Sequence, residues 1–194
     1  MQGINHVGLA LAAPLAAIVL RPELASLPDA WPAWAGLIIG SLAPDLDGGG
    51  TIARPSKWLP DIFPSWIDKA VDRIGLSVSR VVQTLMGHRG GLHWPLWGAL
   101  LIYGGQRWAL PWLVWFGIGF LLHLLGDMLT VQGVPLFGPI SKRKISIFPM
   151  RTGGKLELVL GSCLWLFVVW QLSIIGLAAA HTALSPLLYR LSLQ

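Results

Sequence analysis

Hydrophobic residues recur along the chain in five apolar runs separated by polar loops. These runs cover residues 4–20, 31–43, 92–105, 109–130 and 156–180. Only the last two reach the roughly 20 residues that a helix needs to cross the hydrocarbon core of a bilayer. The second and third runs are short, so their helices must thin the bilayer, let their flanking side chains snorkel to its surface, or lie against neighbours around a water-filled cavity. The pattern predicts an all-α, polytopic membrane helical bundle of about five spans, forming one domain over residues 1–194.

A further helical pattern lies in the polar loop between the second and third runs. Its apolar members, which repeat at helical spacing, are Ile67, Val71, Ile74, Val78, Val81, Val82 and Leu85. The charged residues at other angles of the same helix are Lys69, Asp72, Arg73 and Arg80. This pattern predicts an interfacial amphipathic helix. A helix packed on the membrane domain as a simple strut explains it equally well.

The composition agrees with a membrane protein, because 54% of the residues are hydrophobic and only 12% are charged. In such a chain, the net charge of +5 is better explained by topology and contact with anionic lipids than by nucleic acid. We therefore expect membrane lipids as partners and no nucleic acid, while the oligomeric state stays open. Cys163 is the only cysteine and lies within an apolar run, so we expect a small core residue rather than a disulfide or a metal ligand.

The distribution of basic residues predicts the orientation of the spans. If the five runs alternate in direction, the N-terminus and the loops at 44–91 and 131–155 share one side of the membrane. Eleven of the fourteen Lys and Arg residues fall on that side, against Arg21, Arg107 and Arg190 on the other. Because cytoplasmic loops retain Lys and Arg, we expect a multi-pass inner-membrane protein with both loops in the cytoplasm. No basic residue precedes the first run, so we expect that run to remain in the mature protein.

Side chains that commonly bind metals occur at the run ends that this topology places on the cytoplasmic side. They are His6, Asp45, Asp47, His88, His93, His123 and Asp127. His123 and Asp127 are four residues apart and therefore share a helix face. Two glycines between His88 and His93 let the chain turn sharply there. Each group alone has an ordinary explanation in packing or capping, but their convergence at one end of the bundle predicts a metal site.

Imidazole and carboxylate donors without thiolate suit Zn²⁺, Mn²⁺ or Fe. Seven candidate donors exceed the four of a mononuclear zinc site, so the sequence allows one ion or two. Two-metal sites activate water and clamp both oxygens of a phosphoester displacement. Arg89 is then a candidate catalytic phosphate clamp, or else an arginine that records topology. Glu157 is a candidate proton carrier or a supporting carboxylate, and His181, near the opposite end, is expected to take no part.

The order of these motifs resembles the YdjM-like inner-membrane proteins, which are described as predicted metal-dependent hydrolases. The matching stretches are His6, Gly40 to Asp47, His88 to His93, His123 to Asp127 with Thr130 and Gly133, and Gly154 to Glu157. The family more typically has Thr where this chain has Leu92, which removes a hydroxyl but no candidate ligand.

The resemblance implies a membrane-bound, metal-dependent hydrolase, with a looser similarity to zinc-dependent phospholipases C. The basic run at 142–144 and the membrane-surface position favour an amphiphilic phosphoester or other lipid-derived substrate. Two other classes stay open. Buried ionisable groups among short helices also mark ion or proton transporters, and a metal can simply staple helices together in a protein that is not an enzyme.

Overall fold

The computed structural model describes residues 1–21, 27–28, 30–48, 53–54, 56, 64–87, 90–148 and 150–191. Its elements are α1 (Gly3–Leu20), α2 (Trp31–Gly40), the 3-10 helix η1 (Ala43–Gly48), α3 (Ser65–Met86), the 3-10 helix η4 (Gly91–His93), α4 (Pro95–Arg107), α5 (Pro111–Met128) and α6 (Lys155–Leu191). The described residues contain no strand beyond two isolated bridges. The predicted all-α class is confirmed, and each of the five apolar runs forms a helix.

Among the described residues, three helices are long and apolar enough to cross a membrane. They are α1, α5 and the Lys155–Ala178 part of α6. The apolar helix α2 has 10 residues and α4 has 13. At 1.5 Å per residue, α2 is about 15 Å long, roughly half the thickness of a hydrocarbon core. The bundle therefore combines full spans with short ones, as the run lengths predicted.

Helix α5 is the centre of the bundle and packs between α2 and α4. Glycines at the contact with α2 let the two backbones approach closely. A Cβ at Gly40 would lie 2.1 Å from the carbonyl oxygen of Phe116, and one at Gly119 would lie 2.1 Å from that of Leu37. Small residues take this role in membranes because helices there associate by close packing rather than by the hydrophobic effect.

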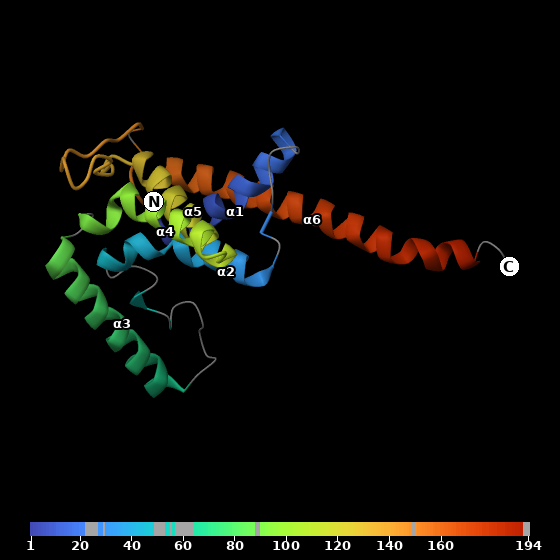
Figure 1. The fold of residues 1–194 in the computed structure, drawn as a ribbon, viewed down its shortest axis with the longest axis horizontal. Coiled ribbons are helices and arrows are strands. Elements are labelled where there is room, and N and C mark those ends of the chain that lie inside the picture. Colours follow the sequence, from blue (N-terminus) through green and yellow to red (C-terminus); the bar gives the residue numbers. More distant parts are fainter. Residues whose placement is uncertain are drawn as a thin grey trace.

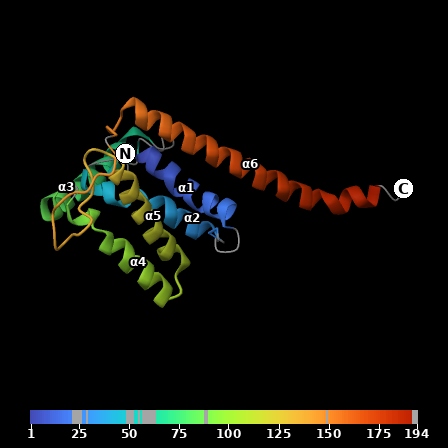
Figure 2. The same ribbon diagram turned by 90° about the horizontal axis from the view of Figure 1, so that it is seen from above.

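Helix α6 packs mainly on α1 and then extends past the other helices, away from the N-terminal end of the bundle (Figures 1 and 2). Its 37 residues correspond to about 55 Å of helix. Because one neighbour covers only one face, Cys163 is exposed. The expectation that it is a small core residue was wrong, since the apolar run around it is apolar on all sides and only part of it faces protein.

Helix α3, the short helices η1 and η4, and the segment between α5 and α6 lie near the end of the bundle where the N-terminus is found (Figures 1 and 2). The predicted amphipathic helix is present as α3, which lies beside the bundle and contacts η1 (Figure 1). The segment between α5 and α6 folds back on itself through paired backbone hydrogen bonds between Val134 and Ile145, at 3.0 and 2.8 Å. The short helices η1 and η4 also end here, so the polar loops surround one end of the helices.

Candidate metal centre

The candidate site is built on the last turns of α5. His123 and Asp127 are both fully buried and face the same side of this helix, as their spacing of four residues predicted. Nε2 of His123 lies 3.7 Å from Oδ2 of Asp127. An imidazole and a carboxylate inside an apolar helix are costly to bury without a partner or ligand. The groups that surround His123 and Asp127 therefore determine whether the two side chains pair with protein or bind a ligand.

Other elements place three further donors around Asp127 and His123. His6 of α1 and His93 of η4, both fully buried, lie with their Nε2 atoms 3.3 and 3.6 Å from the Asp127 carboxylate. Asp45 of η1 has Oδ1 at 3.7 Å from Nε2 of His123. The rings of His6 and His123 are stacked with centroids 3.7 Å apart. Residues more than 120 positions apart in the sequence thus meet at one point.

Asp47 extends the cluster from the same short helix. Its Oδ2 atom lies 3.4 Å from Nδ1 of His93, and its side chain is 1% exposed. Both aspartates of η1 therefore point inward, as predicted, although the backbone that directs them is a 3-10 helix that includes Pro44 and not the extended or turn segment expected after it. Six of the seven predicted ligands come together, and the seventh, His88, lies outside the described residues.

The separations between these donors suit a metal better than direct hydrogen bonds. The nitrogen–oxygen distances of 3.3 to 3.7 Å exceed the usual hydrogen-bond length of about 2.9 Å. Two ligands at 2.0–2.1 Å from a tetrahedral ion are about 3.4 Å apart. Within the described residues, both ring nitrogens of His6 and of His93 are buried without a hydrogen bond. Such orphaned nitrogens next to carboxylates fit a divalent cation of the kind the sequence predicted.

The backbone fixes the tautomer of His123. Its Nδ1 atom is 2.7 Å from the carbonyl oxygen of Ser41. A carbonyl oxygen only accepts, so Nδ1 carries the hydrogen and the lone pair is on Nε2. Nε2 of His123 is buried, has no hydrogen bond among the described residues, and points at the aspartates. Backbone hydrogen bonds of this type orient histidine ligands in metal sites.

The donors form two overlapping groups of three. One contains His6, His123 and Asp127, and the other contains Asp45, His93 and His123; within each group the donor atoms lie within 4.8 Å of one another. His123 offers one lone pair and can therefore serve one ion. Asp127 offers two oxygens, with Oδ1 near His6 and Oδ2 near His93 and His123. If two ions bind, Asp127 is thus the residue able to bridge them.

Asp45 marks the open side of the cluster. Its side chain is 21% exposed, whereas the side chains of His6, His93, His123 and Asp127 are fully buried. Among these five side chains, solvent therefore reaches only that of Asp45. The amino group of Met1 occupies another side, where it contacts Oδ1 of Asp127.

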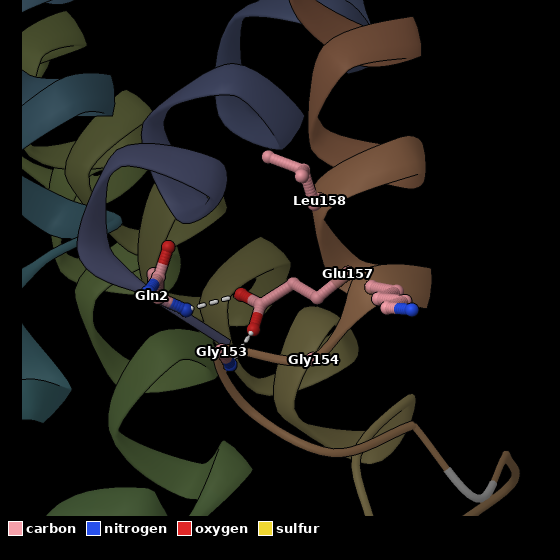
Figure 3. A pocket seen from close by; sticks show the side chains of 6 residues that line it. Gln2, Gly153, Gly154, Glu157 and Leu158 are labelled. Carbon is pink, nitrogen blue, oxygen red and sulfur yellow. Dashed lines mark hydrogen bonds between the residues drawn. The ribbon is translucent and has the colours of Figure 1, made fainter.

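Glu157 lies beside the cluster rather than in either group of three. Its carboxylate accepts hydrogen bonds from the backbone N–H of Gln2 and of Gly153 (Figure 3). It accepts a further hydrogen bond from the side chain of Asn5 at 3.0 Å. These contacts fasten the start of α1 to the start of α6 at the edge of a cavity of about 190 Å³. The predicted role of Glu157 in proton transfer stays a prediction, while its visible contacts hold the segment that carries His6.

The other predicted residues divide between the described and undescribed parts of the chain. Arg89, the predicted phosphate clamp, lies outside the described residues, as does His88. His181 is exposed on the C-terminal half of α6, remote from the cluster in sequence and fold. The sequence analysis did not identify the Ser41 carbonyl or Asn5. The position of Asn5 directly before His6, inside an apolar run, was the one signal available for it.

Comparison with known proteins gives a consistent result. A family model described as YdjM inner membrane protein matches residues 1–193. The inner membrane protein YdjM of Escherichia coli (strain K12) is 30% identical over 160 residues, covering 78% of this chain and 72% of that protein. The protein of the same name from Shigella flexneri matches to the same extent. No solved structure is significantly similar to the chain.

Proposed function

The chain belongs to the YdjM family of inner membrane proteins, as its motifs suggested, and we propose that it is a membrane-bound, metal-dependent hydrolase of an amphiphilic phosphoester. The observation that carries the proposal is the buried donor set around Asp127, whose histidine nitrogens, apart from Nδ1 of His123, lack hydrogen bonds in the described residues. A buried carboxylate with three surrounding imidazoles is an expensive arrangement for packing alone. It is a usual arrangement for binding a cation.

The residues that would hold the cation are His6, His93, His123, Asp45 and Asp127, with Asp47 supporting His93. We favour Zn²⁺ or Mn²⁺, as one ion or as two. When bound, such an ion supplies Lewis-acid activation of water and of the phosphoryl group. The chain itself supplies orientation, because the Ser41 carbonyl sets the tautomer of His123. The chain also excludes water from the donors on the side away from Asp45.

Asp45 is the residue best placed to meet an incoming water. Its partly exposed carboxylate lies at the opening of the cluster, where Oδ1 or Oδ2 can accept a proton from that water. Glu157 is the alternative proton acceptor. Arg89 lies two residues before η4 in the sequence and would hold the substrate phosphate with its planar guanidinium.

The substrate class follows from where the site lies. The donors gather at one end of a membrane bundle, where lipid headgroups are the most abundant phosphoesters. The loop between α5 and α6 adds exposed Lys142, Arg143 and Lys144 at that end. Cations next to a membrane surface attract anionic headgroups. We place this end in the cytoplasm from the distribution of basic residues, and a reporter fused after Gln194 should then read as periplasmic.

The decisive experiment is metal analysis of the purified full chain followed by a screen of phospholipids and simple phosphodiesters for hydrolysis. We expect bound Zn²⁺ or Mn²⁺ and turnover of at least one phosphoester class. The Arg89→Lys variant should keep its metal while turnover falls about tenfold, because lysine keeps the charge but cannot bind phosphate through two nitrogens. Metal without any turnover would instead favour a structural staple, and metal-dependent flux across sealed vesicles would favour a transporter.

A further inference from the structure

Helix α3 has three distinct faces, and two of them have no protein partner among the described elements. One face packs toward η1 and includes Ser79, which is 3% exposed. A second face is apolar and exposed: its members are Val71, Ile74, Val78, Val81 and Leu85, between 39% and 77% exposed. The third face carries Lys69, Arg73 and Arg80, roughly 140° around the helix from the centre of the apolar face.

The basic face forms a groove. Lys69, Arg73 and Arg80 line a hollow of about 320 Å³ together with Asp72, Leu76 and Ser77. Within the described part of the chain, none of the three cations is in a salt bridge. The one carboxylate in the groove, Asp72, accepts hydrogen bonds from the backbone N–H and the hydroxyl of Ser56, at 3.0 and 2.6 Å. Three cations therefore face the hollow and the nearest acid is turned toward Ser56.

We propose that α3 lies at the headgroup level of the membrane and that this groove binds the phosphate of anionic phospholipids. An exposed row of Val, Ile and Leu on the same helix is unfavourable in water but favourable among acyl chains. Although Lys69, Arg73 and Arg80 lie on another face of the helix, their long side chains can reach around it to headgroup phosphates. The bundle already lies in a membrane, so the complementary surface is adjacent. The inference does not depend on whether the metal centre hydrolyses anything.

The apolar face is tested with a fluorophore on single cysteines in the full chain, with Cys163→Ser as background. A label at Val78→Cys, on the apolar face, should be quenched by lipids with brominated acyl chains. A label at Thr84→Cys, on the exposed side nearer the cations, should instead be quenched by water-soluble acrylamide. Equal acrylamide quenching at both positions without lipid quenching would place α3 in water and overturn the proposal. Val78 labels that quench each other between chains would assign this face to a second copy, and would overturn it too.

The groove is tested with a label at Ser77→Cys in nanodiscs. An equal mixture of phosphatidylcholine and phosphatidylglycerol should shield this label from acrylamide about twofold better than phosphatidylcholine alone. The triple variant Lys69→Gln, Arg73→Gln, Arg80→Gln should lose that difference. Arg107→Gln, an exposed arginine on α4, is the matched control and should keep it. Dependence on phosphatidylglycerol that survives the triple variant, or equal shielding by inorganic phosphate with phosphatidylcholine alone, would overturn the assignment to lipid.

Discussion

Helices α5 and α6 are both long and apolar, and both carry a histidine, yet the two histidines lie in opposite environments. His123 and Asp127 of α5 are fully buried, because α1, α2 and α4 surround that helix. Cys163 and His181 of α6 are exposed, because α6 packs mainly on α1. Polar residues in an apolar helix thus form a site only where several neighbouring elements contribute donors. The predictions below test this contrast, beginning with the largest effect.

Asp127→Asn should abolish stable metal binding, with an affinity loss of about a hundredfold or more. Asparagine lacks the negative charge and one of the two carboxylate oxygens that face three histidines. Metal content of the folded protein measured by mass spectrometry checks this. His181→Ala on α6 is the matched control and should retain full metal content. Full occupancy in folded Asp127→Asn would show that the cluster serves helix packing.

Gly119→Leu should destabilise the bundle by about 3 kcal/mol or more, because even a Cβ there meets the backbone of α2 at 2.1 Å. Thermal unfolding in detergent, followed by circular dichroism, measures this effect. Gly176→Leu on α6 is the control, since a Cβ at Gly176 meets nothing within 4 Å. Similar unfolding temperatures for the two variants would contradict the close contact between α2 and α5.

Glu157→Gln should have the smallest effect of the three and should separate its two suggested roles. If Glu157 mainly fastens α1 to α6, metal affinity falls about tenfold, and turnover recovers when the metal concentration is raised. If Glu157 carries a proton, turnover stays low at saturating metal. A metal titration of activity distinguishes these outcomes, and Gln171→Leu, elsewhere on α6, tests for a general effect of removing a polar group from this helix.

The sequence predicted the helices and the identity of the donors because both depend on local patterns. The lengths of the apolar runs predicted the five helices, and the spacing of His123 and Asp127 predicted that they share a helix face. How the helices pack against one another could not be predicted in this way. Whether Cys163 faces protein depends on how many helices surround α6, and nothing local to an evenly apolar run encodes that number.

The interactions that orient the donors could not be predicted from the sequence either. The hydrogen bond from His123 to Ser41 uses a backbone carbonyl, which every residue has, so no residue type marks it. Two contacts of Glu157 likewise use backbone N–H groups, those of Gln2 and Gly153, which no residue type marks in the sequence. Side-chain chemistry could be predicted from the sequence, whereas the backbone geometry that directs it required the fold.

The wide separation of the donors along the chain has a consequence for biogenesis. His6 enters the membrane with the first helix, whereas Asp127 arrives only with α5, after the α-helices α1 to α4 have been made. Membrane helices insert first and associate afterwards, so the imidazole of His6 is in the membrane before its carboxylate partner, Asp127, has been synthesised. The last helix then fastens the first through Glu157. If the cluster binds a cation, that binding is therefore one of the final events in assembly, and a truncated chain that lacks α5 would present an unpartnered histidine to the bilayer.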